Sequence, residues 1–265
     1  MTVDSHAHAS VHWFEPIEVL LFQMDRNEVE RAVLIQHSGE FDNEYILQSA
    51  ATHPDRFTAV VSVDYESPSA TENLRRSADA GAVGVRLRPS VRSAGDDPLS
   101  LWRAAHELGM TVSALGPALH FSGDVFREVL TEVPGIQVAV EHLGELRRNN
   151  DKLDVETARM VYASIEPFPD VAVKIHGFGE GSGRAEPRTD SPFASPKETL
   201  HQLAFEMLGP ERLMWGSDFP PSSGREGYTN TLRYPREALR ASGMSPTAEQ
   251  AIFHGTALRY FSPSH

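Results

Sequence analysis

Short apolar segments rich in valine, isoleucine and leucine recur along the chain every roughly 25 to 40 residues, and longer segments with helical periodicity separate them. This alternation predicts strand–helix units arranged around a parallel sheet. The predicted strands are Thr2–His8, Arg31–His37, Phe57–Val63, Ala82–Arg88, Met110–Leu115, Ile136–His142, Val171–His176 and Arg212–Ser217.

The intervening segments carry helix signals. Phe14–Arg26 follows the first predicted strand, and Pro68–Ala80 has a proline near its first turn. Asp97–Leu108 is followed by Gly109, a residue type that is common just after a helix end. Two more helices are expected, one from Ser195-Pro196 to a point before Gly209 and one from about Pro246 to Phe261.

Eight strands, each followed by a helix, most simply close into an α/β fold of the (β/α)8 TIM-barrel type. The chain has 265 residues, of which 40% are hydrophobic, so residues 1–265 can form one domain around one sizeable core. An open doubly wound sheet is the alternative. That fold usually carries a glycine-rich phosphate loop after an early strand, whereas the first predicted strand here ends in His-Ala-His.

One long irregular stretch, Gly177–Ala194, follows the seventh predicted strand. In a barrel this position lies on the catalytic face. Loops of this length without structure of their own are usually lids over a site or mobile insertions, and both interpretations stay open.

Composition narrows the choice of partners. The chain has 24 basic and 37 acidic residues, and the net charge of -13 argues against binding to nucleic acid or to an anionic membrane. A small-molecule substrate that carries a carboxylate stays possible, because a pair of arginines can reverse the field inside a pocket. No cysteine is present, which excludes disulfides, thiolate zinc sites and cysteine nucleophiles. With no secretory signal and no apolar stretch of about 18 residues, we expect a soluble cytoplasmic protein, either a monomer or a homo-oligomer.

The first predicted strand ends with two histidines. Alternate side chains of a strand share a face, so His6 and His8 point to the same side. Two imidazoles in this arrangement can ligate one metal ion. The alternative is a pair of histidines on a solvent-exposed strand.

The eighth predicted strand ends in a carboxylate. The apolar run Leu213–Trp215 is followed by Gly-Ser-Asp-Phe-Pro, which places Asp218 at the carboxyl end of the strand. Barrel enzymes keep their catalytic groups at this end. Asp218 could bind a metal, act as a general base or cap the following turn, and the residue alone does not separate catalysis from capping.

Two further strands end in titratable residues. His142 follows the sixth strand, and the period of two predicts that it shares a face with Val138 and Val140. Lys174 and His176 share a face of the seventh strand. Histidines at several strand ends converge on one mouth in a closed barrel, which scattered surface histidines would not do.

Two arginines close the fourth predicted strand. Arg86 and Arg88 share a face and could grip a substrate carboxylate, or could form ion pairs with acidic residues at the mouth. The remaining histidines are expected to be structural. His37 and His120 are the main exceptions to consider, because each lies near a strand end.

Three motifs resemble the amidohydrolase superfamily: Asp4–His8, Val140–Gly144 and Trp215–Pro220. More narrowly, they resemble its amidohydrolase-related (amidohydrolase 2) branch of small barrels, which includes sugar-lactone and pyrone-dicarboxylate lactonases as well as non-oxidative decarboxylases. Gly255–Phe261 is similar to the G-N-A-x-x-x-F helix that ends many members, with Thr256 in place of asparagine. The resemblance spans Asp4 to Phe261.

The resemblance implies roles for particular residues. His6 and His8 match the metal-binding pair of the first strand, and Asp218 matches the carboxylate that ligates the metal and accepts a proton from the attacking water. His142 matches the histidine that polarises the substrate or transfers protons. The implied cofactor is one divalent metal ion, with zinc expected and manganese as the alternative.

The chain also departs from the family pattern. Binuclear members commonly have a carboxylated lysine on strand 4, where this chain has Arg86 and Arg88, so a two-metal site is disfavoured. Decarboxylase members carry a metal-binding histidine near the end of strand 5, where this chain has Ser113–Pro117, and His120 is the nearest substitute. Because pyrone-dicarboxylate lactonases act without a metal, a metal-free reaction stays open.

These observations favour a lactonase-like hydrolase that opens a lactone or related cyclic carbonyl compound. Asp218 would be the base, with His142 and His176 as further catalytic candidates and Arg86 or Arg88 as substrate ligands. One alternative is a metal-dependent decarboxylase of a small carboxylic acid, and another is a non-catalytic barrel that binds a metabolite. Release of acid from a lactone panel distinguishes the hydrolase from the binding protein, and release of carbon dioxide identifies the decarboxylase.

Overall fold

The computed structural model describes residues 1–146, 154–180 and 198–263. One parallel sheet contains eight strands in chain order, and it closes where β8 returns to β1 and Ala7 pairs with Phe219. The strands are β1 (Val3–Ala7), β2 (Arg31–Ile35), β3 (Phe57–Val61), β4 (Ala82–Leu87), β5 (Thr111–Ala114), β6 (Val138–Val140), β7 (Val171–Ile175) and β8 (Leu213–Trp215). All eight predicted strands are confirmed, and the closure excludes an open doubly wound sheet.

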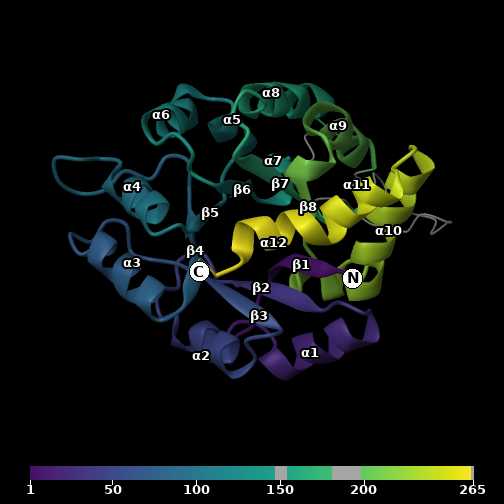
Figure 1. Cartoon of the computed structure of the whole chain (residues 1–265), viewed down its shortest axis with the longest axis horizontal. Coiled ribbons are helices and arrows are strands. Elements are labelled where there is room, and N and C mark those ends of the chain that lie inside the picture. The colour runs from purple at the N-terminus through teal and green to yellow at the C-terminus, as the bar shows by residue number, and fades with distance from the viewer. Residues whose placement is uncertain (147–153, 181–197, 264–265) are drawn as a thin grey trace.

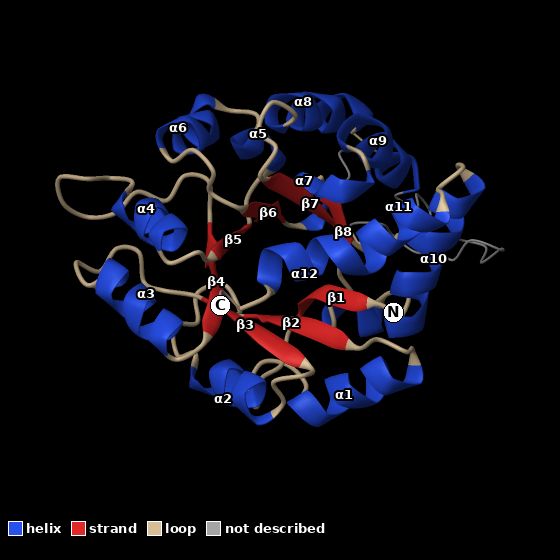
Figure 2. Cartoon of the chain, viewed as in Figure 1, coloured by secondary structure: helices blue, strands red, loops and turns tan. Residues whose placement is uncertain are grey.

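Helices surround the barrel (Figures 1 and 2). They are α1 (Ile17–Arg26), α2 (Glu44–Thr52), α3 (Ala70–Asp79), α4 (Ser100–Glu107), α5 (Ala118–Phe121), α6 (Asp124–Glu132), α7 (His142–Glu145), α8 (Val155–Ile165), α9 (Glu198–Leu208), α10 (Tyr228–Ala241), α11 (Pro246–Gln250) and α12 (Thr256–Phe261). The described residues also form two short 3-10 helices, η1 (Pro210–Arg212) and η2 (Pro221–Gly224), and one π-helical turn, η3 (Ala251–Gly255).

The predicted helices match α1, α3, α4 and α9, and the last one corresponds to α11, η3 and α12 in succession. The first begins later than predicted, at Ile17, because Pro16 keeps an extended backbone in front of it. Gly109 has a φ of 65°, as expected for the residue that follows a helix end.

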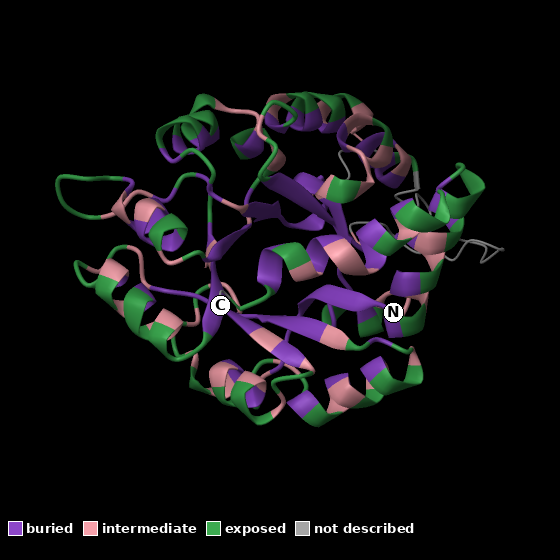
Figure 3. Ribbon diagram, in the orientation of Figure 1, coloured by how far each residue is buried: buried purple, intermediate pink, exposed green. Residues whose placement is uncertain are grey.

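The core has two apolar layers, one on each side of the sheet. The outer layer lies between the strands and the helices and includes Trp102 and Val140. The inner layer fills the barrel with side chains such as Val60 and Met214, against which α12 packs Tyr260 and Phe261. Figure 1 shows α12 lying across the barrel, and Figure 3 shows the strands mostly buried, with single intermediate positions on strands such as β2 and β3. Because α12 covers the end of the barrel where the strands begin, the polar side chains gather at the opposite end, the mouth formed by the carboxyl ends of the strands.

The prediction that His142 shares a face of the strand with Val138 and Val140 is wrong. Val138 and Val140 belong to the outer layer, whereas Ala139 faces the interior. By alternation it is Glu141 that points inward from the end of β6, where its side chain is fully buried. His142 lies beyond the strand with a φ of 53°, so the backbone has left the period of two before it places the imidazole at the mouth.

Only residues 177–180 of the stretch predicted as a lid or mobile insertion belong to the described part of the chain, and residues 181–194 lie outside it. Within the described ranges, no helix combines the length and apolar character that crossing a membrane requires.

Candidate active site

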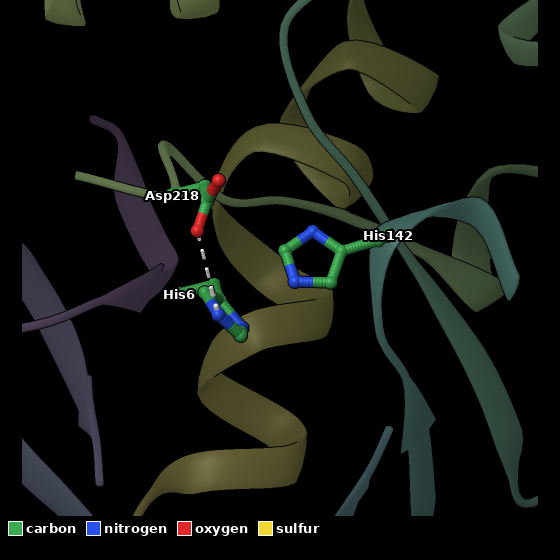
Figure 4. A group of neighbouring side chains, drawn as sticks. All are labelled: His6, His142 and Asp218. Carbon is green, nitrogen blue, oxygen red and sulfur yellow. Dashed lines mark ion pairs between the residues drawn. The ribbon is translucent and has the colours of Figure 1, made fainter. Parts of the chain in front are cut away.

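Side chains from β1 and from the end of β8 meet at the barrel mouth. His6 and Asp218 face each other, with 4.0 Å between His6 Nε2 and Asp218 Oδ1, and the ring of His142 lies beside them (Figure 4). His8 Nε2 is 3.7 Å from the same carboxylate oxygen. A Cβ atom at Gly216 would lie 2.6 Å from the Cβ of His6, so this close approach of β8 to β1 requires glycine. The structure therefore brings together the three residues predicted to hold a metal.

Hydrogen bonds orient His8 and Asp218. His8 Nδ1 lies 2.7 Å from the carbonyl oxygen of Ile35, which can only accept, so Nδ1 carries the hydrogen and Nε2 presents a lone pair towards Asp218. Arg225 donates to Asp218 Oδ2 at 2.8 Å and leaves Oδ1 facing the histidines. Asp218 itself has a φ of 51°, a strained value that directs its carboxylate into the mouth.

The charge on Asp218 is favoured despite its burial. Burial alone would raise the pKa of this carboxyl, but the contact with His8 and the positive charges of His142 and Arg225 outweigh it and lower the pKa. Asp218 is therefore an ionised carboxylate at neutral pH, which a general base or a metal ligand has to be.

A buried lysine forms the floor of the site. Lys174 Nζ lies 3.2 Å from His6 Nδ1, donates to Ser113 Oγ at 2.8 Å and stands 5.0 Å above the ring centre of Phe261. Burial lowers the pKa of Lys174 to about 7, although the carboxylate of Glu141 opposes the shift. Lys174 thus fixes the orientation of the His6 ring from below.

Arg86 is paired inside the barrel. Its Nε and Nη2 atoms donate to Glu141 at 3.0 and 2.6 Å, and its Nη1 donates to the carbonyl of Gln36 at 3.0 Å. Burial would raise the pKa of Glu141, but the charges of Arg86 and Lys174 outweigh it and lower the pKa to about 2. Arg86 was expected either to bind a substrate carboxylate or to form an ion pair at the mouth, and in the structure it forms the ion pair.

Arg88 lies in different surroundings. It is exposed, has no ion-pair partner within the described ranges, and lines a cavity of about 110 Å³ together with Arg86, Tyr65 and Ser62. The cavity lies over the carboxyl ends of β3, β4 and β5. Arg88 therefore remains available for an anionic ligand.

A second group of donor atoms lies on the β7 side of the mouth. Glu180 Oε2 is 2.5 Å from His176 Nε2 and 3.2 Å from His142 Nδ1. Burial alone would lower the pKa of His142, but the carboxylates of Glu180, Asp218 and Glu141 outweigh it and raise the pKa to about 9. His142 therefore lies between the two groups.

The mouth offers ligand atoms for a metal ion. One atom each of His6, His142 and Asp218 lies within 4.8 Å of the others, and His8 adds a further nitrogen beside Asp218. Ligand atoms about 2.1 Å from a tetrahedral ion lie roughly 3.4 Å apart, and the distances from Asp218 Oδ1 to His8 and His6 are 3.7 and 4.0 Å. His6 Nε2 is buried and has no hydrogen-bond partner among the described residues. An unpartnered buried nitrogen facing a carboxylate is what a cation would satisfy.

The two histidines singled out as possible exceptions do not join this cluster. His120 is exposed on α5. His37 is half-buried, and its ring stacks on Trp13 with 5.0 Å between ring centres. Burial lowers the pKa of His37, and the neighbouring His8 adds to the effect.

Several residues at the mouth had no role predicted from the sequence: Ser113, Glu141, Glu180 and Arg225, with Lys174 noted only for its position on β7. A signal existed for Glu141, because a charged residue directly after a buried strand needs an opposite charge nearby. Glu180 and Arg225 follow strands in irregular segments, where no periodicity points to them.

Comparison with known proteins defines the class. A family model described as amidohydrolase matches residues 4–262, and the chain belongs to this family. The resemblance predicted from the three sequence motifs is thereby confirmed. A search of curated proteins gave no match.

Solved structures share the fold over the whole chain. An amidohydrolase from Burkholderia multivorans with bound zinc superimposes with a TM-score of 0.78 at 17% identity and covers 100% of both chains. A probable 2-pyrone-4,6-dicarboxylic acid hydrolase from Acinetobacter baumannii gives 0.71 at 16% identity, with 98% of each chain covered. A 2,6-dihydroxybenzoate decarboxylase from Rhizobium gives 0.65 at 16% identity, also with 98% of each chain covered.

Proposed function

We propose that this amidohydrolase is a hydrolase that opens a small lactone, or a related cyclic carbonyl compound, bearing a carboxylate. The observation that carries the proposal is the Asp218 carboxylate, which is buried at the mouth, held by Arg225 through Oδ2 and directed by Oδ1 towards His6 and His8. The similarity to a probable pyrone-dicarboxylic acid hydrolase supports the substrate class.

Asp218 acts as the general base. Its Oδ1 atom accepts a proton from a water molecule as that water attacks the carbonyl carbon of the ring. The ester C–O bond then breaks, and the proton passes to the leaving oxygen, so that one water is added and a hydroxy acid is formed. Arg225 keeps the carboxylate in place during this cycle through its 2.8 Å hydrogen bond to Oδ2.

His6, His8 and Asp218 would hold a divalent ion, with zinc expected and manganese as the alternative. When bound, the ion supplies Lewis-acid polarisation of the carbonyl and makes water more acidic. Lys174 Nζ contacts Nδ1 of His6 and orients that ring, whereas the His8 ring is oriented by donating from Nδ1 to the carbonyl of Ile35.

His142 and His176 complete the proton-handling groups. The ring of His142 lies 4.9 Å from that of His6 and 5.3 Å from that of His176, measured between centres. His142 therefore reaches the space beside Asp218 where a carbonyl or a leaving oxygen would sit. His176, one ring further away, supports the position of His142.

Arg88 is the proposed anchor for the substrate carboxylate, since Arg86 is already neutralised by Glu141. Arg88→Ala is expected to raise the KM for a carboxylate-bearing lactone by roughly 10-fold to 100-fold, the scale of one charge-assisted hydrogen-bonded contact, with little change in kcat. Steady-state kinetics measure both constants. Arg233→Ala, which removes a half-exposed arginine of α10, serves as the matched control. An unchanged KM in Arg88→Ala would remove Arg88 from the substrate site.

A panel of lactones and carboxylic acids tests the function itself. Acid release from a lactone, without carbon dioxide, is the expected result. Carbon dioxide release from an aromatic or unsaturated acid would instead identify a decarboxylase, like the structurally similar enzyme from Rhizobium. Tight binding of ligands from the panel without turnover would identify a metabolite-binding barrel.

A further inference from the structure

Trp13 is an exposed tryptophan beside the barrel mouth, in the loop between β1 and α1. The chain has three tryptophans, and two of them, Trp102 and Trp215, are fully buried, whereas 65% of Trp13 is exposed. Tryptophan supplies a large apolar face, which makes it common at binding surfaces. A single exposed apolar residue needs no explanation by itself, so the surroundings of Trp13 decide what it can do.

Backbone hydrogen bonds hold the loop around Trp13. Ser10 Oγ accepts from the backbone nitrogens of His12 and Trp13 at 3.1 and 3.2 Å. The backbone nitrogen of Ser10 donates to the carbonyl of Glu15 at 3.1 Å and closes the turn. The exposed position of the indole is therefore set by the fold of the loop.

Trp13 belongs to a row of four rings that leads to Asp218. The indole stacks on His37 with 5.0 Å between ring centres and 13° between planes. His37 contacts Phe14 at 5.4 Å, and Phe14 stacks on His8 at 5.0 Å and 22°. His8 Nε2 lies 3.7 Å from Asp218 Oδ1. Trp13 thus stands at the outer end of a row whose inner end contacts the carboxylate of the site.

Chain neighbours of His37 line two cavities. Gln36 lines a cavity of about 270 Å³ together with Trp13, and Ser38 lines the cavity of about 110 Å³ that contains Arg88. An apolar cavity of about 150 Å³ is enough to hold benzene, so the larger cavity has room for one ring. A substrate whose carboxylate lies at Arg88 can therefore place a second group beside Trp13.

The larger cavity selects against a charged group. Glu40, Asp42 and Glu44 line it, and their carboxylates repel an anion. Ala9 and Ile46, which are buried, supply an apolar wall, and a charged group would have to lose its water to pack against them. A neutral flat ring meets both conditions, because it carries no charge and can stack on an indole.

We propose that Trp13, backed by His37, is a stacking subsite for a neutral aromatic ring of the substrate. The substrate is then a lactone that carries an aryl group as well as a carboxylate. This assignment of the substrate rests on the proposed function, whereas the stacking itself is tested by binding alone. Trp13 lies away from the carbonyl under attack, so it contributes to substrate affinity and specificity and leaves the chemical step to the residues around Asp218.

Kinetics with a matched pair of carboxylate-bearing lactones, one with a phenyl group and one without, test the substrate class. Trp13→Ala is expected to raise the KM of the phenyl-bearing lactone by roughly 5-fold to 10-fold, the scale of one stacked aromatic pair, with little change in kcat. The lactone without the phenyl group should show no change, and Trp13→Phe should recover part of the loss. Phe22→Ala, which removes an exposed aromatic side chain of α1, is the matched control.

Binding without turnover tests the subsite independently of hydrolysis. The probes are the cyclic ethers that correspond to the two lactones, and titration calorimetry measures their affinity. The wild type is expected to bind the phenyl-bearing ether more tightly than the plain one, and Trp13→Ala is expected to lose this preference. A preference that is absent in the wild type, or unchanged in Trp13→Ala, would overturn the subsite.

Two further outcomes separate this inference from its alternatives. Unchanged affinity in Trp13→Ala together with a smaller molar mass by light scattering would assign Trp13 to a contact between copies of the chain and overturn the subsite. A phenyl preference that depends on Trp13, with no lactone hydrolysed by the wild type, would overturn the proposed function and leave the stacking subsite standing.

Discussion

Replacing Asp218 with asparagine is expected to lower kcat by roughly 10²-fold or more, the scale of lost general-base catalysis. Asparagine keeps the shape of the side chain and can still contact Arg225, but it cannot take a proton from water. Oδ1 of Asp218 is the oxygen placed to accept the proton, since it faces His6 and His8 while Oδ2 accepts a hydrogen bond from Arg225. Steady-state kinetics on the hydrolysed lactone measure the effect.

Folding has to be controlled in this experiment, because Asp218 is buried and has a positive φ. Asparagine is among the residues that adopt this backbone conformation most readily, so little loss of stability is expected. Circular dichroism and thermal unfolding of Asp218→Asn check this expectation, and Asp170→Asn, an exposed position, is the matched control. A folded Asp218→Asn variant with near-normal kcat would remove Asp218 from the mechanism.

The fold could be predicted because its signals are local and repeated. Each strand of a barrel is buried on both faces, so it produces a short apolar run that is visible without any knowledge of its neighbours. The closure of β8 onto β1 followed from the count of strand–helix units. Helix starts were predicted less accurately, as α1 shows, because Pro16 keeps an extended backbone that composition alone does not separate from a helix.

The meeting of His6, His8 and Asp218 could also be predicted, since strands 1 and 8 are neighbours in any closed barrel of this type. The side of the sheet towards which His142 points could not be predicted. Its prediction assumed that the period of two continues to position 142, whereas β6 ends at Val140 and the backbone turns to positive φ. A strand pattern says nothing about side-chain direction once the strand has ended.

The polar contacts beneath the site, between Glu141 and Arg86 and between Lys174 and Ser113, could not be predicted for another reason. Glu141 is neutralised by Arg86, which is 55 positions away in the sequence, and Lys174 reaches Ser113 across the barrel. Such pairs become visible only when the closed barrel brings the strands together. Before that, Arg86 is equally compatible with a substrate carboxylate and with an internal partner, and only the fold shows which of the two it meets.

His6→Ala combined with His8→Ala is expected to lower the zinc content by about one ion per chain and to lower kcat/KM by about 10³-fold or more. Lewis-acid stabilisation is worth several kcal/mol, and each 1.4 kcal/mol or so is a factor of ten in rate. Both rings are buried and their Nε2 atoms face Asp218 Oδ1. Removing both leaves Asp218 as the sole remaining member of that ligand set, which cannot hold a divalent ion tightly.

Metal analysis and lactone kinetics on the same preparation separate the two parts of this prediction. His106→Ala combined with His120→Ala removes two exposed histidines and should change neither quantity. Unchanged zinc content in the His6→Ala/His8→Ala variant would show that these rings do not bind the ion. Loss of the ion with activity retained would instead show that hydrolysis proceeds without it, with Asp218 activating water while Arg225 holds its Oδ2 atom.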